Sequence, residues 1–534
     1  MAKNILVIDD DRQVLISLER LFKKEGYEVI CASSGKEALE WIEKRDFGLV
    51  IVDIRMPDLD GIETVRKIKE IRSNKSKPAI PVVFITGYSD VVAIDKAKQY
   101  GEVVLKPFDL VEFLNCVKQQ SAKRRVVITG VGVVAPNGIG KDEFWEANIR
   151  GKSGISRINH FDTSNLQCKI AGSIYNFDPT KFLDPLTVRK TDRFVHLGLV
   201  AAKLALQDSE LDLKKEDPKR IGTIVGSGLG GIIFHEKQIE LAYQKGLDRL
   251  NPLAVPKITP NAVPGHISIE FGLKGPNMAI STACASGTNA IGEVFRKIQN
   301  NEMDIAFAGG AEAPLTPVTF GAYCALRVLS ERNDSPEEAS RPFDRERDGF
   351  VMSEGAAILI LELLDHALKR NAHIYAEIVG YATQSGAHHM VIPLEDATDV
   401  AEVMRLTIED AGLKTKDIDY INAHGTSTQL NDKAETKAIK IVFGDYAYKV
   451  PISSTKSMVG HSIGAAGAIE AVVCCLVIEN NVIPPTINYK NRDPDCDLDY
   501  VPNQARKAKV RTVLSNSFGF GSCNACIVLG RYSG

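Results

Sequence analysis

The sequence predicts an α/β protein built from at least two domains. Its 534 residues, 44% of them hydrophobic, exceed what one core organises, since single cores stop growing near about 250 to 300 residues. Short apolar runs alternate with amphipathic stretches over residues 3–120, and strands and helical stretches alternate again in the Gly- and Ala-rich remainder. Runs of Val, Ile and Leu between helices are typical of a parallel sheet covered on both faces.

The first domain, residues 1–121, is therefore predicted to be a doubly wound parallel sheet. Its strands are expected at the apolar runs 5–8, 49–52, 81–85 and 103–105. Its helices are expected at the amphipathic stretches 13–24, 35–44, 61–71 and 110–119. A short basic linker, 119–125, precedes the next predicted strand, so the two domains are expected to stay within contact range.

Charged and polar side chains follow the expected strands of this first domain. Asp9 and Asp10 end the first run, and Asp53, Thr86 and Lys106 end three later ones. Because functional groups collect at the carboxyl ends of parallel strands, the three carboxylates should meet and need a cation such as Mg²⁺. Lys106 and the metal could then neutralise a phosphoryl group arriving at Asp53. Any one acid alone could merely cap a helix, but all five positions together favour a phosphoacceptor site.

The motifs IDD, DIRMPDLDG, FITG and LKPF resemble the response-regulator receiver family, which has a flavodoxin-like fold. The resemblance implies that Asp53 accepts a phosphoryl group from a histidine kinase or a phosphotransfer protein. It implies Asp9, Asp10 and Asp53 as Mg²⁺ ligands, Thr86 as the hydroxyl that follows the phosphoryl group, and Lys106 as its counter-ion. Val103 stands where the family usually has Tyr or Phe, so the output face is expected to be altered.

The second domain, residues 122–534, contains a candidate nucleophile. Cys284 follows an apolar run and precedes a predicted helix, where the helix dipole should lower the pKa of the thiol. One cysteine among ten is more often a small core residue. Two histidines in loop-to-helix contexts strengthen the case, His424 in NAHGTSTQLND and His461 in SSTKSMVGHSIGAAGAIE, with Lys456 upstream of the second.

Four segments of this domain, STACASGTNA, AHGTSTQLND, TKSMVGHSIGAAGAIE and NSFGFGSCNA, resemble the elongating 3-oxoacyl-[acyl-carrier-protein] synthases. The resemblance spans residues 125–530. It implies the thiolase fold, in which two similar α/β halves, here about 122–371 and 372–534, stack in five αβαβα layers. It also implies a homodimer and an acyl carrier protein as partner.

The chemistry implied by the resemblance is a decarboxylative Claisen condensation. Cys284 would take an acyl group from a carrier-protein thioester, and the N–H groups of Cys284 and Phe518 would form the oxyanion hole. Malonyl-carrier protein would lose CO₂, and His424 and His461 would hold the developing enolate, so condensation needs no cofactor. The 3-oxoacyl product would serve fatty-acid or related polyketide or polyene elongation, and we hypothesise that phosphorylation of Asp53 modulates it.

Further residues take their predicted roles from the same resemblance. The pair Lys456 and Glu470 would orient His461 and support the site, and Phe518 would be the gate beside Cys284. Four residues are expected at the substrate: Thr426 and Thr428 at the phosphopantetheine arm, Leu229 at the pocket floor, and Tyr323, where relatives usually have Phe. Gly386 and Val391 depart from the family pattern. Because neither belongs to the Cys-His-His set, they affect the prediction of the substrate more than the prediction of the reaction type.

Bulk properties exclude several classes of function. The net charge is −3 without a long Lys/Arg block, which argues against nucleic acid as a partner. The apolar run 471–478 is shorter than the roughly 20 residues that span a bilayer, so no membrane insertion is expected. The start, MAKNILVIDDD, is not typical of a signal peptide, and ten cysteines without paired spacing indicate a reducing, cytoplasmic location.

Two other functions remain open at this point. The synthase domain could be a non-catalytic partner subunit, but such subunits typically lack the nucleophile, so an intact Cys284, His424 and His461 disfavour this reading. Alternatively, the receiver could be the working part and the synthase domain a dimerising scaffold in a phosphorelay. A GxGxxG match at residues 226–231 is disfavoured as a dinucleotide site, because no acid closes a βαβ unit there.

Overall fold

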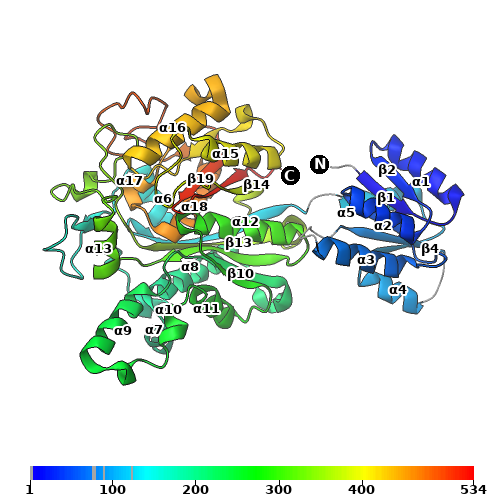
Figure 1. Ribbon diagram of the computed structural model, residues 1–534, viewed down its shortest axis with the longest axis horizontal. Coiled ribbons are helices and arrows are strands. Elements are labelled where there is room, and N and C mark those ends of the chain that lie inside the picture. The colour runs from blue at the N-terminus through cyan, green and yellow to red at the C-terminus, as the bar shows by residue number, and fades with distance from the viewer. Residues whose placement is uncertain (1–3, 75–79, 88–90, 122–123, 534) are drawn as a thin grey trace. The chain divides into compact units, whose positions relative to one another are not determined.

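The computed structural model describes residues 4–74, 80–87, 91–121 and 124–533. Contacts divide the chain into two compact units, Met1–Arg124 and Arg125–Gly534 (Figure 1). Each unit has its own sheet and its own hydrophobic clusters.

The first unit is a five-stranded sheet in the order β2-β1-β3-β4-β5, and every neighbouring pair of strands is parallel. The strands are β1 Asn4–Ile8, β2 Glu28–Ala32, β3 Leu49–Asp53, β4 Val82–Thr86 and β5 Glu102–Leu105. The helices are α1 Arg12–Lys24, α2 Gly35–Lys44, α3 Gly61–Asn74, α4 Val91–Lys98 and α5 Leu110–Ser121. This topology confirms the predicted doubly wound parallel sheet.

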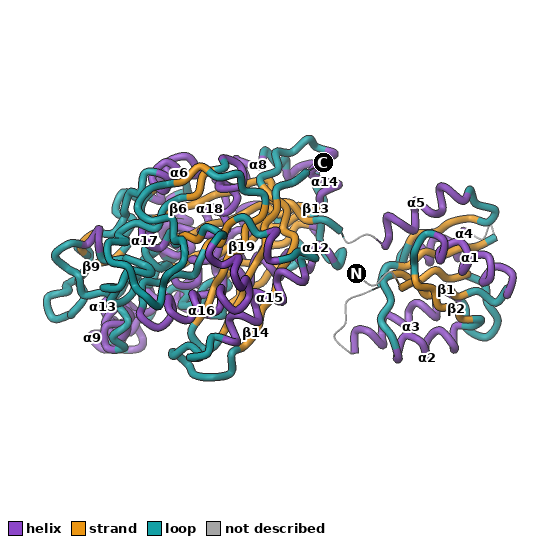
Figure 2. Tube along the Cα trace, turned by 90° about the horizontal axis from the view of Figure 1, so that it is seen from above, coloured by secondary structure: helices purple, strands orange, loops and turns teal. Residues whose placement is uncertain are grey.

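Helices cover both faces of this sheet (Figure 2). Successive residues of β1 point to opposite faces: Ile5 packs in one cluster with Phe22 of α1 and Phe113 of α5, and Leu6 packs in the other with Ile42 of α2. β2 is not among the predicted strands, although it contains the apolar run 29–32; it is an edge strand and is only partly buried.

The second unit is built on one sheet of eleven strands in two sets of five, with a short flanking strand. The first set is β11 Asn277–Ile280, β10 Ile221–Gly226, β12 Ile305–Glu312, β13 Gly355–Leu363 and β6 Val126–Ala135. The second set is β14 Ala376–Ser385, β20 Cys523–Gly530, β19 Thr512–Gly519, β15 Tyr420–Asn422 and β16 Ile452–Ser453. A short β6–β14 pairing joins the sets, and β7, Gly138–Ile139, pairs with β6.

Three layers of helices alternate with the two sets of strands. The outer layers are α8 Arg193–Ser209 with α11 Ala262–Phe271 against the first set, and α15 Thr398–Asp410 with α16 Gln429–Phe443 against the second. The central layer is α12 Ser286–Gln299 with α18 Ala466–Asn480, which packs against both sets. This arrangement confirms the predicted αβαβα layering.

Smaller elements connect these layers. The helices are α6 Lys141–Ile149, α7 Pro185–Lys190, α9 Ile232–Lys245, α10 Ala254–Ile258, α13 Pro317–Ala325, α14 Leu364–Lys369 and α17 Lys456–Val459. The short strands are β8 Ser156–Arg157, β9 Ile170–Ala171, β17 Val482–Ile483 and β18 Arg506–Lys507. Two single-turn 3₁₀ helices, η5 Ala283–Ala285 and η9 Ile463–Ala465, precede α12 and α18.

Glycines let the two central helices approach each other closely. A Cβ at Gly287 would lie 2.8 Å from the main-chain nitrogen of Ala468, and one at Gly467 would lie 2.0 Å from the Thr288 hydroxyl. The stretch Ile463–Asn480 is apolar enough to span a membrane, but 89% of it is buried in this unit, as expected of a core helix. The close packing brings the starts of α12 and α18 together.

Candidate active site

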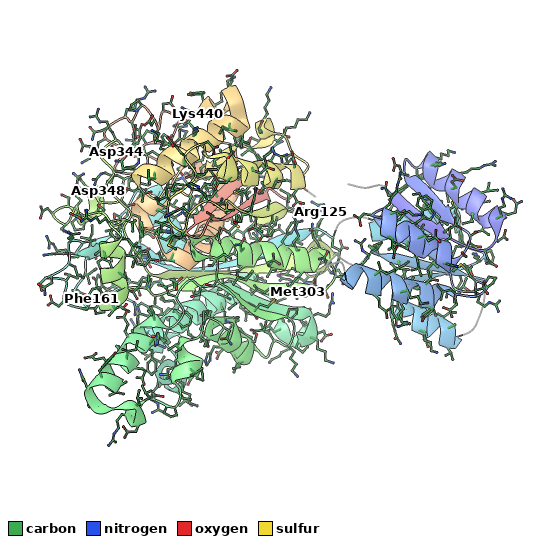
Figure 3. The ribbon with its side chains drawn as sticks, viewed as in Figure 1. Arg125, Phe161, Met303, Asp344, Asp348 and Lys440 are labelled. Atoms are coloured by element: carbon green, nitrogen blue, oxygen red, sulfur yellow. The ribbon has the colours of Figure 1, made fainter. Side chains whose placement is uncertain are left out.

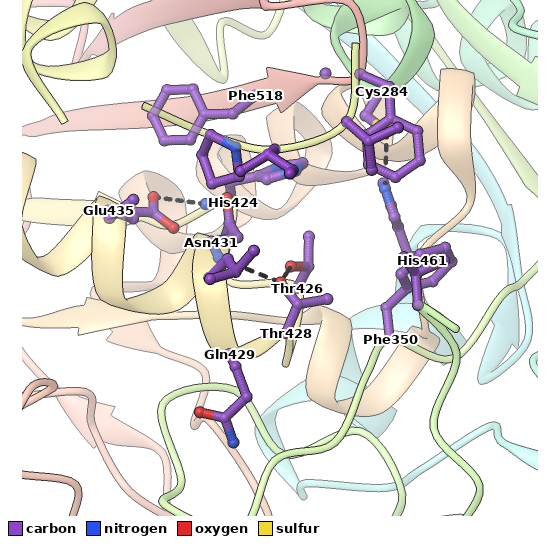
Figure 4. A pocket seen from close by; sticks show the side chains of 18 of the residues that line it. Cys284, Phe350, His424, Thr426, Thr428, Gln429, Asn431, Glu435, His461 and Phe518 are labelled. Carbon is purple, nitrogen blue, oxygen red and sulfur yellow. Dashed lines mark hydrogen bonds between the residues drawn. The ribbon is translucent and has the colours of Figure 1, made fainter. Parts of the chain in front are cut away.

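Cys284 lies in η5, directly before α12, and is buried. Its Sγ lies 3.0 Å from Nε2 of His461 (Figure 4). Burial raises the pKa of the thiol to about 11, although Lys456 and two main-chain N–H groups act to lower it. The predicted lowering of this pKa was wrong, because loss of solvation outweighs the effects that favour the thiolate. A nearby base must therefore remove the proton.

His461 can serve as that base. Its main chain is fixed to the neighbouring segment, since its N–H donates to the carbonyl of Val351 over 2.7 Å and its carbonyl accepts from the N–H of Ser353 over 2.9 Å. The ring packs edge-on against Phe350, with centroids 5.2 Å apart. Burial and the charge of Lys456 hold the pKa of His461 well below its usual value, so the imidazole is neutral near pH 7.

His424 follows β15 and faces His461, with the ring centroids 5.5 Å apart. Glu435 of α16 holds the loop in place, because its carboxylate accepts the N–H groups of His424 and Gly425, each over 2.8 Å. Burial, the charge of Lys456 and the proximity of the His461 ring, which disfavours a second protonated imidazole, also hold the pKa of His424 well below its usual value. The site thus presents two neutral imidazoles.

The Lys456–Glu470 ion pair is almost completely buried between α17 and α18. The resemblance assigned this pair to His461, but Nζ of Lys456 lies 3.4 Å from Nδ1 of His424. Because an ammonium group only donates, Nδ1 accepts and the proton of His424 resides on Nε2. Burial raises the pKa of Glu470 to about 7, against the opposing effect of Lys456.

Sequence reasoning missed two residues of the site, Phe520 and Glu435. Two main-chain N–H groups lie beside the Cys284 thiol: that of Cys284 itself, which belongs to the predicted pair, and that of Phe520, where Phe518 was predicted. The Phe518 ring packs instead against His424, with centroids 5.6 Å apart. The motif around His424 did not predict a role for Glu435, which reaches the main chain of the histidine from α16, 11 residues further along the chain.

A cavity of about 270 Å³ opens beside Cys284. Seven of the predicted residues line it: Cys284, Tyr323, His424, Thr426, Thr428, His461 and Phe518. The hydroxyls of Thr426 and Thr428 lie 2.9 Å apart, exposed to the cavity as the resemblance implied. Leu229 is not among the lining residues; its N–H donates to the buried Glu312.

In the first unit, Lys106 bridges two of the predicted carboxylates. Its Nζ donates to Oδ2 of Asp9 over 2.8 Å and to Oδ1 of Asp53 over 2.7 Å, and Thr86 ends β4 at the same edge. Burial raises the pKa of Asp9. Asp10 is exposed, and in the described part of the chain no three acidic, His or Cys side chains gather around a common point.

The donor set at this edge nevertheless fits Mg²⁺. Asp9 and Asp53 bind the same ammonium group, so their carboxylates are close enough to share one ion. Mg²⁺ commonly takes one or two carboxylates and completes its shell with water. Val103, at the position of the usual aromatic, is half-buried in β5 against the sheet core.

Family models match three segments of the chain. The response regulator receiver domain matches residues 5–118, the N-terminal domain of beta-ketoacyl synthase matches residues 123–367, and the C-terminal domain of beta-ketoacyl synthase matches residues 375–490. The matches follow one another along the chain without overlapping.

Individual proteins match the second unit over nearly their whole length. The 3-oxoacyl-[acyl-carrier-protein] synthase 2 of Coxiella burnetii is 48% identical over 409 residues, which are 77% of this chain and 99% of that protein. The protein of the same name from Synechocystis is 44% identical over 410 residues, 77% of this chain and 99% of that protein.

Solved structures share the architecture. A type II polyketide ketosynthase, solved in complex with its acyl-carrier protein and bound to a hexaketide, is 37% identical with a TM-score of 0.72 and covers 77% of this chain and 100% of its own. A beta-ketoacyl synthase from Burkholderia phymatum is 35% identical with a TM-score of 0.71, at the same coverage of both chains.

Proposed function

Because the chain belongs to the beta-ketoacyl synthase family and carries a receiver domain, we propose that it is a 3-oxoacyl-[acyl-carrier-protein] synthase. The reaction is the condensation of malonyl-carrier protein with an acyl group carried on Cys284. The observation that carries the proposal is the contact of Cys284 with a neutral His461, facing a second neutral imidazole in one cavity.

The first half-reaction is transfer of the acyl group to the enzyme. Nε2 of His461 takes the proton of the Cys284 thiol, and Sγ attacks the thioester carbonyl of the acyl-carrier protein. The main-chain N–H of Phe520, directed at this thiol, supports the negative oxygen that forms. The carbon–sulfur bond to the carrier breaks, and the pantetheine thiolate leaves with the proton that His461 held.

The second half-reaction is decarboxylative condensation. Malonyl-carrier protein loses CO₂, and the electron pair of the broken bond becomes an enolate on the thioester. The Nε2–H of His424, fixed by Lys456 on the far side of the ring, donates to the enolate oxygen. His461 adds a second donor when its ring proton moves from Nδ1 to Nε2 after the first half-reaction. The enolate carbon attacks the acyl carbonyl, and the Cys284 thiolate leaves, which yields 3-oxoacyl-carrier protein.

The substrates are proposed to arrive on an acyl carrier protein. One structural relative was solved in complex with such a carrier protein. The paired hydroxyls of Thr426 and Thr428 in the cavity wall suit the amide and hydroxyl groups of a phosphopantetheine arm. A homodimer and a cytoplasmic location stay predictions from the sequence.

Intact-protein mass spectrometry after mixing with an acylated carrier protein tests the acyl transfer. The wild type should gain the mass of one acyl group, and Cys284→Ala should gain none. Cys116→Ala, which removes a partly buried cysteine of the first unit, should gain the group as the wild type does. An unmodified wild type, or an acylated Cys284→Ala, would contradict the proposed nucleophile.

For the receiver unit we propose that Asp53 accepts a phosphoryl group from a histidine kinase or phosphotransfer protein. Asp9 and Asp53 would hold a Mg²⁺ ion, with Asp10 at the exposed rim of the site. The ion supplies neutralisation of the incoming phosphoryl charge. Lys106, which already bridges both carboxylates, can swing its ammonium group onto a phosphoryl oxygen at Asp53.

A further inference from the structure

Glu312 is a fully buried carboxylate at the end of β12, and the mechanism above gives it no role. It accepts four hydrogen bonds, all from neutral donors. Three come from main-chain N–H groups, those of Gly228 over 2.6 Å, Leu229 over 3.1 Å and Gly464 over 3.0 Å. The fourth comes from the hydroxyl of Ser227 over 3.1 Å.

These bonds join two loops that are far apart in the sequence. One is the loop 227–230 after β10, and the other is η9, which follows His461. The loops also touch directly, since a Cβ at Gly228 would lie 3.2 Å from Cγ2 of Ile463 and 3.1 Å from the Glu312 carboxylate. Glu312 is the polar centre of this junction.

Ile463, at the start of η9, has a backbone conformation that its side chain disfavours. Its φ is 48°, in the left-handed region that a β-branched residue rarely adopts. Such a conformation is strained and persists only where the surroundings enforce it. The next residue, Gly464, donates its N–H to Glu312. This bond therefore fixes the peptide group that joins Ile463 to Gly464.

The strained residue forms part of the substrate cavity. Ile463 lines it together with Cys284 and His461, and packs in one hydrophobic cluster with Phe320 and Tyr323 of α13. A shift of Ile463 would therefore change both the space beside the thiol and the wall that an acyl chain meets.

We propose that Glu312 is a positioning residue that selects among acyl chains by holding Ile463 in place at the wall of the cavity. This inference rests on the proposed synthase function. Burying a carboxylate without a cation is costly, and here burial raises the pKa of Glu312 to about 7. A carboxylate is nevertheless the side chain suited to this position, because its two oxygens accept from three converging amides and a hydroxyl.

The test compares acylation of Cys284 across carrier-protein thioesters of increasing chain length in the wild type and Glu312→Gln. Glutamine keeps the shape but points an NH₂ group at N–H donors, so Ile463 should relax. The ratio of kcat/KM for the preferred chain to kcat/KM for the next longer chain should fall by about tenfold, mainly through a change in KM. This size is expected because an apolar pocket distinguishes chains that differ by one methylene by about 10- to 200-fold. An equal loss for every chain length would overturn the inference.

A double-mutant cycle tests the route through Ile463. Ile463→Ala should flatten the chain-length preference, and adding Glu312→Gln to it should flatten the preference no further. Fully additive effects on the preference would contradict the proposal. If Glu312→Gln does not fold, Ser227→Ala removes one of the four bonds and should shift the preference in the same direction, by less; an unchanged preference in this variant would also contradict it.

Asp344 provides a matched control (Figure 3). Its buried carboxylate also accepts three main-chain N–H bonds, from Glu346, Lys490 and Asn491, and none of these residues lines the cavity. Asp344→Asn should lower stability but leave the chain-length preference unchanged. If the wild type itself gains no acyl group, the synthase function fails; if it is acylated and Glu312→Gln keeps the wild-type preference, only the role of Glu312 fails.

Discussion

At the scale of single residues, the chemistry depends on how burial changes the proton affinity of each group. Motif spacing predicted Cys284, His424 and His461, and the structure places all three around one cavity. The sequence could not predict the direction of the thiol pKa, because desolvation depends on the segments η9, β19 and β20, which pack against η5 from far along the chain. The sequence also could not predict that Lys456 lies beside His424 and not His461, because this depends on how distant segments pack.

The two active-site imidazoles should stay neutral at pH 6.5, where an exposed histidine is half protonated. Their pKa values are lowered, so folding favours the neutral form, and the stability that this contributes is lost as the pH falls below about 6.5. NMR of isotope-labelled imidazoles, assigned with His424→Asn and His461→Asn, measures the protonation directly. A midpoint near 6.5 for either ring would be inconsistent with this account.

Glu470→Gln should destabilise the protein by about 3–5 kcal/mol, because it leaves the Lys456 ammonium buried without its counter-ion. Urea unfolding followed by circular dichroism measures the change. The exposed pair of Glu402 and Arg405 is the control: Glu402→Gln should cost no more than about 1 kcal/mol. An equal change in the free energy of unfolding for the two variants would contradict the burial of the Lys456–Glu470 pair.

At the scale of elements, the site depends on the central helices α12 and α18. Cys284 lies directly before α12, and His461 lies shortly before α18. Hydrophobic periodicity predicted the helix after Cys284, and the resemblance supplied the five layers. The closeness of the two helices could not be predicted from a pattern, because it depends on which glycine faces which neighbour. Here Gly287 of α12 faces Ala468 of α18, and Gly467 of α18 faces Thr288 of α12.

Gly292 of α12 makes a similar contact with β14. A Cβ there would lie 2.2 Å from the ring of Tyr381, so Gly292→Ala should cost about 1–3 kcal/mol by overpacking. Gly265→Ala in α11 is the matched control, since a Cβ there meets no atom within 4 Å, and alanine in a helix should stabilise by roughly 0.5–1 kcal/mol. Chemical unfolding of both variants measures the difference, and a stabilised Gly292→Ala would refute the close packing.

At the scale of the whole molecule, the chain joins a receiver unit to a beta-ketoacyl synthase unit. The strand-end pattern predicted Asp9, Asp53, Thr86 and Lys106 at one edge of the first sheet, and the structure gathers Asp9, Asp53 and Lys106 through hydrogen bonds. The sequence alone could not predict that Asp9 and Asp10 differ in burial. Which side of the chain each of them faces depends on the turn that follows β1, where Asp9 is buried and Asp10 exposed.

Asp53→Asn should abolish phosphorylation of the full chain by a small-molecule phosphodonor with Mg²⁺, measured as the gain of one phosphoryl mass. Asp109→Asn, at the exposed start of α5, should be phosphorylated like the wild type. If phosphorylation modulates the synthase, condensation rates with and without the phosphodonor should differ in the wild type and not in Asp53→Asn. Equal rates throughout would mean that the receiver does not regulate catalysis.

The central claim is that the cavity around Cys284 joins an acyl group to a malonyl unit. It is tested most directly by mixing the full chain with acyl- and malonyl-carrier protein and reading the carrier products by mass. The account predicts a 3-oxoacyl-carrier protein two carbons longer than the acyl donor, released with CO₂, and no such product from Cys284→Ala. Absence of the product in the wild type, or its formation by Cys284→Ala, would contradict it.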